Sequence, residues 1–358
     1  MHGLTEGVRI ESLRARPLSV ALVEPFIIAT GRVDTTRAVE VEACVTCRGE
    51  TAVGLGEAAC LPPVTGEDQL DVLVAIAHLA RELEGRMLEP QALDTLRPVA
   101  RAGLETAVLD ALARIRFVPV RTLLGGTRAT AALETDVTVA IGEPARMADL
   151  ARAWVARGFR ALKVKVGKDV DTDARALEAI GRAAPGARLR VDANAGYSAA
   201  QALALAAACE RLGLAVECWE QPCAADDLDG MAEVAAALEA PVIADESVTS
   251  LHDLERLVAC RAADGVNLKL AKSGGPLACQ ALGEAAREAG LRVMMGGMVE
   301  TRLGMTAAAH VACALGGVDF VDLDTAWLLV EDPYDGGYDA EGPRYTMPDT
   351  PGLSVSRR

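Results

Sequence analysis

Aromatic side chains are scarce in this chain of 358 residues, at 3% of the total, although apolar residues of all kinds reach 51%. The hydrophobic core must therefore consist mainly of alanine, valine and leucine. Long apolar runs are also missing: the longest Ala- and Leu-rich run, Ala199–Cys209, contains Gln201 and is far shorter than the roughly 20 residues of a membrane span. With 24% charged residues, the composition is globular and argues against a disordered chain.

Positive charge is in short supply, because 36 Lys and Arg face 51 Asp and Glu, for a formal net charge of −15. Lys and Arg supply most of the affinity for phosphate backbones, so this balance argues against a nucleic-acid partner. Residues Met1–Gly7 lack a basic region followed by an apolar stretch. We therefore expect no secretion signal, no membrane partner and a cytoplasmic location.

The nine cysteines do not form a pattern that indicates disulfides or a zinc site. Only Cys44 and Cys47 have metal-like spacing, and no second pair accompanies them. Both lie in the run Val39–Cys47, which is typical of a strand. We expect ordinary reduced thiols rather than a zinc or redox site.

The N-terminal third reads as strands followed by helices. Apolar and polar residues alternate over Ala38–Cys47, as in a half-buried strand. Apolar residues then recur at helical spacing in Thr65–Leu83 and Pro98–Arg114. We therefore predict an α+β domain over residues 1–125, which ends in the turn-rich segment Leu124–Thr127.

A repeated strand-and-helix unit follows over residues 126–324. Polar residues stand at the ends of short β-branched runs, at intervals of 24 to 28 residues: Lys165, Asp192, Glu220, Asp245 and Lys269. Eight such runs predict an α/β fold, a modified (β/α)8 barrel of the TIM type whose chemistry lies at the C-terminal strand ends. An open doubly wound sheet is the alternative, but its G-x-G-x-x-G turn is missing. The tail, residues 325–358, is expected to return to the N-terminal unit and complete a capping domain.

Three acidic residues, Asp192, Glu220 and Asp245, end neighbouring strands. Three carboxylates in one place repel each other unless a cation compensates them, and a hard divalent ion prefers oxygen ligands. The pattern predicts a Mg²⁺ site, with one ion per subunit. The alternative is three unrelated helix caps, since acidic residues often precede helices.

Lysines flank this trio on two opposite strands. Lys163 and Lys165 share one face at the end of the second strand, and Lys269 ends the sixth. A confined lysine beside a metal can act as a general base. A cation that holds the substrate carboxylate would stabilise the enediolate left by loss of an α-proton, and a lysine on each face would exchange that proton, which inverts the carbon. The alternative is that the lysines form structural salt bridges.

These motifs together resemble the enolase superfamily, specifically its muconate lactonising subgroup. The matching features are the K-x-K at Lys163–Lys165, the acidic trio, Lys269 in NLKLAKSGG, Met294–Thr301 and Gly54–Ala58. The resemblance implies a capped barrel, Mg²⁺ and a lysine pair as acid and base. The four histidines lie outside these motifs, which disfavours the branch that uses a histidine base.

The eighth strand ends in a D-x-D, Asp322 and Asp324, whose two carboxylates would suit a substrate ammonium group. In this position the motif is similar to that of the dipeptide epimerases, which invert the α-carbon of the C-terminal residue of an L,L-dipeptide. That resemblance implies an isomerase with a dipeptide as its small-molecule partner. It also implies that Lys163 contacts the substrate carboxylate, that Thr138 contacts the substrate, that Asn194 orients the metal ligands, and that Met298 lies near the site.

Side-chain specificity is expected to come from the loop that contains Glu24 and Asp34. Relatives that prefer an acidic C-terminal residue are similar in carrying an Arg in this loop, where this chain has Gly31. The two acids and the net charge favour cationic or neutral dipeptides over Ala-Glu.

Three alternatives stay open. An N-acylamino acid racemase or an o-succinylbenzoate synthase of the same subgroup would act on substrates without a free ammonium group. A catalytically silent binding protein would be expected to have lost some of the lysine and acid positions, and all are present. A homo-oligomer is expected from the fold family.

Overall fold

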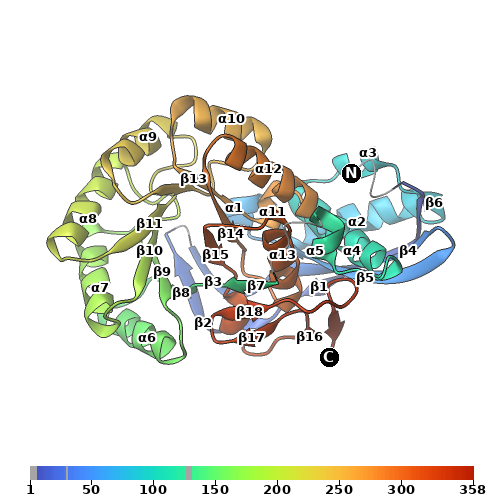
Figure 1. The fold of residues 1–358 in the computed structure, drawn as a ribbon, viewed down its shortest axis with the longest axis horizontal. Helices are drawn as coiled ribbons and strands as arrows, with labels where there is room; N and C mark the ends of the chain where they lie inside the picture. Colours follow the sequence, from blue (N-terminus) through green and yellow to red (C-terminus); the bar gives the residue numbers. More distant parts are fainter. Residues whose placement is uncertain (1–5, 30, 126–130) are drawn as a thin grey trace.

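The computed structural model describes residues 6–29, 31–125 and 131–358. Two parts share the chain (Figure 1): an antiparallel sheet with its helices on one side, and a barrel ringed by helices on the other. The predicted end of the first part at Gly126 and Thr127 lies outside the described residues. All nine cysteines are free thiols.

The capping sheet is built from the alternating N-terminal segments. Its strand order is β5-β4-β1-β6, with β1 at Val8–Leu18, β4 at Ala38–Cys47, β5 at Glu50–Ala59 and β6 at Arg86–Met87. The helices of this part are α1 (Pro62–Thr65), α2 (Gln69–Leu83), α3 (Pro90–Asp94), α4 (Pro98–Ile115) and α5 (Val120–Gly125). Helix α4 packs closely on β5. Gly54 permits this approach, since a Cβ at this position would lie only 2.1 Å from the carbonyl oxygen of Ala107.

Eight parallel strands form the barrel in sequence order, which confirms the predicted α/β barrel fold. They are β8 (Val137–Val139), β9 (Ala161–Lys165), β10 (Arg188–Asp192), β11 (Val216–Glu220), β12 (Val242–Ala244), β13 (Gly265–Leu268), β14 (Arg292–Gly296) and β15 (Phe320–Asp322). The surrounding helices are α6 (Pro144–Ala156), α7 (Val170–Ala183), α8 (Ala199–Arg211), α9 (Leu228–Ala237), α10 (Leu251–Cys260), α11 (Leu270–Ser273), α12 (Pro276–Glu288) and α13 (Arg302–Leu315). Buried Val, Leu and Ala side chains fill the space between strands and helices.

The first and last barrel strands meet at a seam. Within the described ranges, no strand ladder joins β8 to β15. Instead the backbone N–H of Asp136 donates to the carbonyl oxygen of Val321 at 3.0 Å, and Arg190 donates to the same oxygen, also at 3.0 Å. One backbone hydrogen bond and one from a side chain therefore replace a ladder here.

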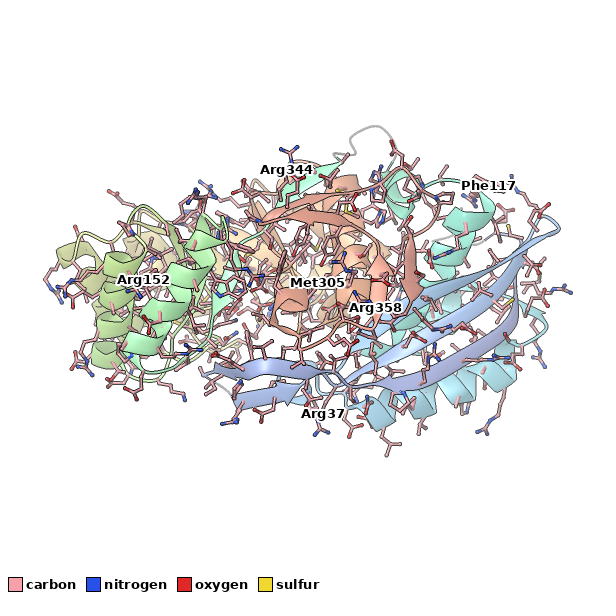
Figure 2. All side chains as sticks on the ribbon, turned by 90° about the horizontal axis from the view of Figure 1, so that it is seen from below. Arg37, Phe117, Arg152, Met305, Arg344 and Arg358 are labelled. Atoms are coloured by element: carbon pink, nitrogen blue, oxygen red, sulfur yellow. The ribbon has the colours of Figure 1, made fainter. Side chains whose placement is uncertain are left out.

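A hairpin extends from the capping sheet to the barrel mouth. Its strands are β2 (Ala21–Ile28) and β3 (Gly31–Thr35), and Figure 2 shows the blue N-terminal strands running along one side of the molecule. The N–H of Ile141 donates to the carbonyl oxygen of Ile27 at 3.0 Å, and that of Val330 donates to Ala21 at 2.9 Å. The hairpin is thus tied to the barrel at one point, Ile141 after β8, and to the C-terminal tail at another, Val330.

The C-terminal tail contacts both parts. It contains the 3-10 turn η1 (Thr325–Leu328) and the strands β16 (Tyr334–Gly336), β17 (Asp339–Glu341), β18 (Arg344–Thr346) and β19 (Val355–Arg357). Strand β18 pairs with β7 (Ala132–Glu134) beside the barrel, while the guanidinium of Arg357 lies 2.6 Å from carboxylate oxygens of Glu40 and Glu42 in the capping sheet. In the part of the chain that the structure describes, no helix combines the length and apolarity needed to cross a membrane.

Candidate active site at the barrel mouth

The three acidic residues of the strand ends lie side by side. Asp192 ends β10 and is directly opposite Glu220, which ends β11, while Asp245 follows β12. Each is at most 1% exposed. Parallel strands in register bring their C-terminal residues to one rim, so neighbouring strand ends place these carboxylates together.

Lysines lower the pKa of two carboxylates of this trio, whereas the pKa of the third is raised. Burial raises the pKa of Asp192, but Lys165 and Lys163 lower it by more than burial raises it. The pKa therefore lies well below its ordinary value. Lys269 and Lys272 do the same for the pKa of Asp245. For Glu220, burial and the charge of Asp192 together raise the pKa to about 7.

Lys163 lies beneath the trio and is 1% exposed. Its Nζ is 2.8 Å from Glu220 Oε2, 2.6 Å from Asp322 Oδ2 and 3.1 Å from Asp192 Oδ2. Burial lowers the pKa of Lys163, but these carboxylates outweigh burial and hold it well above its ordinary value. In the structure Lys163 links the trio to the eighth strand. Its predicted contact with the substrate carboxylate stays a prediction.

Lys165 and Lys269 line one small cavity at the mouth, of about 40 Å³. Lys165 Nζ is 2.5 Å from Asp192 Oδ2, and Lys269 Nζ is 2.6 Å from Asp245 Oδ2. Burial lowers the pKa of Lys269, but Asp245 raises it more, so the amine is charged in this arrangement. A lysine that accepts a proton must first be neutral, so these carboxylates need another cation when either lysine serves as a base.

Lys272 is a site residue that the sequence interpretation missed. Its Nζ is 2.7 Å from Asp245 Oδ1, and it also donates to the carbonyl oxygen of Asp245. The composition could have pointed to Lys272, because the chain has only five lysines. Four of the five are buried at this mouth, and only Lys168 is exposed.

Polar neighbours complete the shell around the acids. The N–H of Asn194 donates to Asp192 Oδ1 at 2.9 Å, and its amide donates to Glu246 Oε1 at 3.2 Å. Asn267 donates to Glu220 Oε1 at 2.9 Å. Sequence reasoning named Asn194 but missed Glu246 and Asn267; Asn267 lies two residues before Lys269, on the same strand face.

The donor set fits a hard divalent cation. Besides the trio, one oxygen each of Asn194 and Glu246 is buried and lacks a hydrogen-bond partner, and both residues line the small cavity. Oxygen-rich, negatively charged sites of this kind suit Mg²⁺. Among residues 6–29, 31–125 and 131–358, no three acidic, histidine or cysteine side chains already surround a common point, and lysine ammonium groups contact all three carboxylates.

The two aspartates of the eighth strand have different surroundings. Asp322 lines the small cavity and is 7% exposed; burial raises its pKa, but Lys163 lowers it more, so the carboxylate is ionised. Asp324 is 1% exposed and accepts the backbone N–H of Thr138 across the seam. Burial and the charge of Asp322 raise the pKa of Asp324 to about 7. Of these two aspartates, only Asp322 presents an ionised carboxylate to the cavity.

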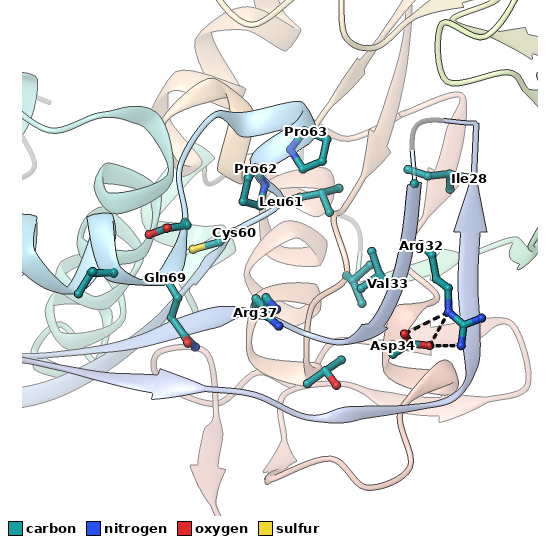
Figure 3. A pocket seen from close by; sticks show the side chains of 15 residues that line it. Ile28, Arg32, Val33, Asp34, Arg37, Cys60, Leu61, Pro62, Pro63 and Gln69 are labelled. Carbon is teal, nitrogen blue, oxygen red and sulfur yellow. Dashed lines mark hydrogen bonds and ion pairs between the residues drawn. The ribbon is translucent and has the colours of Figure 1, made fainter.

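Residues of the hairpin and of the loop after β14 close the cavity. Thr138 and Met298 line it, together with the apolar side chains Phe26, Ile28, Leu61, Val64 and Val299. A second cavity of about 640 Å³, between the hairpin and Cys60–Pro63, shares Ile28, Leu61 and Val299 with the first. Figure 3 shows its polar edge, where Asp34 pairs with Arg32 at 2.9 Å. The other predicted loop acid, Glu24, pairs with Arg146 of helix α6.

Comparison with known proteins assigns the chain to a family. The model of the enolase C-terminal domain-like family matches residues 146–358, more than half of the chain. The chain belongs to the enolase superfamily. The resemblance inferred from the strand-end motifs is thereby confirmed.

Named relatives of this superfamily cover nearly the whole chain. The aromatic dipeptide epimerase of Herpetosiphon aurantiacus is 38% identical, over 97% of this chain and 98% of its own length. A substrate-liganded L-Ala-D/L-Glu epimerase from Bacillus subtilis superposes with a TM-score of 0.90 at 34% identity, over 97% and 98% of the two chains. A dipeptide epimerase from Enterococcus faecalis, complexed with Mg and L-Leu-L-Tyr, gives 0.89 at 30% identity, over 98% of this chain and all of that one. These similarities confirm an isomerase that acts on amino acid derivatives and support dipeptide epimerase activity.

Proposed function

We propose that this enolase-superfamily protein epimerises the α-carbon of the C-terminal residue of L,L-dipeptides. One observation carries the proposal: Lys165 of β9 and Lys269 after β13 line the same cavity as the ionised Asp322. Strands two and six of an eight-stranded ring are opposite each other, so the lysines address the two faces of a bound α-carbon. Asp322 supplies the charge that distinguishes a free amino group from an acylated one.

The chain's own residues divide the work of proton transfer. The neutral amine of one lysine removes the α-proton, and the ammonium group of the other donates a proton to the opposite face, so the carbon is inverted without net change in composition. Asp192, Glu220 and Asp245 would hold one Mg²⁺ per subunit. The dipeptide epimerase from Enterococcus faecalis, which is similar to this chain, is complexed with Mg. When bound, Mg²⁺ supplies positive charge that stabilises the negative charge developing on the substrate carboxylate. Lys163 holds Asp322 at a fixed distance from Asp192 and Glu220 through its contacts with all three carboxylates.

For the side chains of the substrate we propose neutral, apolar dipeptides. Part of the cavity wall is apolar, at Phe26, Ile28, Leu61, Val64 and Val299. A relative named for aromatic dipeptides and one complexed with L-Leu-L-Tyr agree with this chemistry. The acids that favoured a cationic substrate, Glu24 and Asp34, are each neutralised by an arginine. Of the substrates that the sequence predicts, we therefore expect neutral dipeptides to be preferred over both cationic dipeptides and Ala-Glu.

Deuterium incorporation tests the reaction and the substrate class together. The purified protein with Mg²⁺ in D₂O is incubated with dipeptide libraries, and α-deuteration is followed by mass spectrometry. We expect deuterium at the C-terminal residue, abolished by EDTA, with Ala-Leu and Leu-Tyr exchanged faster than Ala-Glu or Ala-Lys. Exchange only on N-succinyl amino acids would contradict the proposal in favour of an N-acylamino acid racemase. Fastest turnover of Ala-Glu would refute the side-chain preference alone.

A further inference from the structure

The D-x-D of the eighth strand extends beyond the barrel ladder. Strand β15 pairs with β14 only as far as Gly296 and Asp322, so Leu323 has no ladder partner in the described part of the chain. Leu323 stands between Asp322 and Asp324. Its N–H belongs to the peptide group shared with Asp322, and its carbonyl oxygen to the peptide group shared with Asp324. Whatever holds these peptides therefore sets the direction of both carboxylates.

Two side chains replace the missing ladder. Thr135 Oγ1 accepts a hydrogen bond from the N–H of Leu323 at 2.8 Å. Tyr345 Oη donates to the carbonyl oxygen of Leu323, also at 2.8 Å. Each peptide group of the motif is thus fixed by a side chain from another element, one before β8 and one in the C-terminal tail.

Tyr345 is itself fixed on every side. It lies on β18 with no exposed surface, opposite Leu133 of β7. The indole N–H of Trp327 donates to its hydroxyl at 2.8 Å, and the ring of Tyr338 stacks on it at 4.1 Å between centroids, with 15° between planes. A hydroxyl that accepts one hydrogen bond from Trp327 directs its own proton at Leu323.

We infer that Tyr345 is a positioning residue for substrate recognition: the C-terminal tail sets the direction of Asp322 through the peptide groups of Leu323. The inference rests on the proposed function, in which Asp322 receives the α-ammonium group of a dipeptide. Tyr345 does not line the cavity, so it acts through the motif and not by contact with the substrate. A buried polar group left without its partner is costly, so loss of the hydroxyl would let the Leu323 carbonyl turn toward another donor.

A pair of ligands that differ only in the amino group tests this inference. L-Ala-L-Leu and propionyl-L-leucine have the same size and carboxylate, but only the dipeptide carries the ammonium group. With the Mg²⁺-loaded enzyme, KM for L-Ala-L-Leu and the inhibition constant of propionyl-L-leucine are measured in one assay. For Tyr345→Phe we expect KM to rise about tenfold, as one misplaced charged hydrogen bond requires, and the inhibition constant to change less than about twofold.

Two further variants separate positioning from general damage. Thr135→Val removes the other support of Leu323 and is expected to give the same selective loss. Tyr334→Phe is the matched control, because Tyr334 is an equally buried tyrosine of the tail whose hydroxyl contacts Glu40 in the capping sheet. We expect it to lower the unfolding temperature about as much as Tyr345→Phe while leaving both ligand constants unchanged.

The outcomes distinguish this inference from the proposed function. Equal changes in both constants, or none, in Tyr345→Phe would overturn the positioning role. A wild-type enzyme that does not discriminate between the two ligands would overturn ammonium recognition itself, and the positioning role with it.

Discussion

The backbone N–H of Thr138 donates a hydrogen bond to Oδ2 of Asp324, across the seam between the first and last barrel strands. This contact makes Asp324 part of the barrel closure. Asp322, two residues earlier, lines the cavity and pairs with Lys163 at 2.6 Å. Two aspartates that look equivalent in a D-x-D therefore have different surroundings, and we expect them to have different tasks.

Amide substitution of each aspartate tests this division. Asp322→Asn removes the ionised carboxylate of the cavity, and we expect kcat/KM on dipeptides to fall by about 10²-fold or more, as for a lost buried charge pair. Asp324→Asn keeps an oxygen that accepts the Thr138 N–H, and we expect less than about a tenfold loss. Steady-state kinetics on Ala-Leu and a thermal melt of each variant give the answer. Equal losses in the two variants would show that the aspartates act together.

Lys165 and Lys269 are expected to serve one face of the substrate each. In Lys165→Ala or Lys269→Ala, epimerisation should fall by at least about 10³-fold, within the range for loss of a general acid or base. Exchange of the α-proton in D₂O should survive for one epimer, and the surviving epimer should differ between the two variants. Lys168→Ala is the control, since Lys168 is the exposed lysine. Loss of exchange with both epimers in either variant would refute a one-lysine-per-face mechanism.

Metal binding should be visible in stability as well as in activity. An ion that binds only the folded state stabilises it by about 2.7 kcal/mol at one hundred times its Kd. We expect Mg²⁺ to raise the unfolding temperature of the EDTA-treated protein by several degrees, and Glu220→Gln to lose most of this rise. Glu210→Gln, an exposed substitution at the end of helix α8, should keep it. A rise that persists undiminished in Glu220→Gln would place the ion elsewhere.

A pair of buried carboxylates between the capping sheet and the barrel predicts the pH dependence of stability. Glu57 of β5 accepts the N–H groups of Thr301 and Gly304, at the start of α13, each at 3.0 Å. Burial and the charge of Glu300 raise the pKa of Glu57 to about 8, and burial raises that of Glu300 to about 7. Both groups hold a proton in the folded protein at pH values where the unfolded chain has released it.

Stability due to this pair must therefore fall as pH rises from about 5 to 8, because unfolding releases protons in that window. Glu300→Gln removes one titrating group and the like charge near Glu57. We expect the difference in unfolding free energy, variant minus wild type, to grow with pH by on the order of 2–3 kcal/mol between pH 5 and 8. Urea unfolding at four pH values measures it. A constant difference would mean that Glu300 is ionised throughout.

The barrel and most of its mouth were determined by features that a single sequence carries. Strand-end residues such as Asp192 and Glu220 recur at the period of one strand and one helix, and parallel strands bring their ends to one rim. The period alone therefore predicts which polar residues meet. The period does not predict Lys272, because this residue lies inside a short helix after its strand. The rarity of lysine in the chain is the one feature of the sequence that points to it.

Tertiary structure alone decided which of these groups contact each other. Lys163 reads as a substrate contact but is held by three carboxylates from three other strands. The pairing of Glu24 with Arg146 depends on where the hairpin meets helix α6. Tyr345 reaches Leu323 only because β18 pairs with β7. Spacing along the chain encodes which residues share a strand face, whereas contacts between distant segments depend on the packing of the whole fold, which no local pattern records.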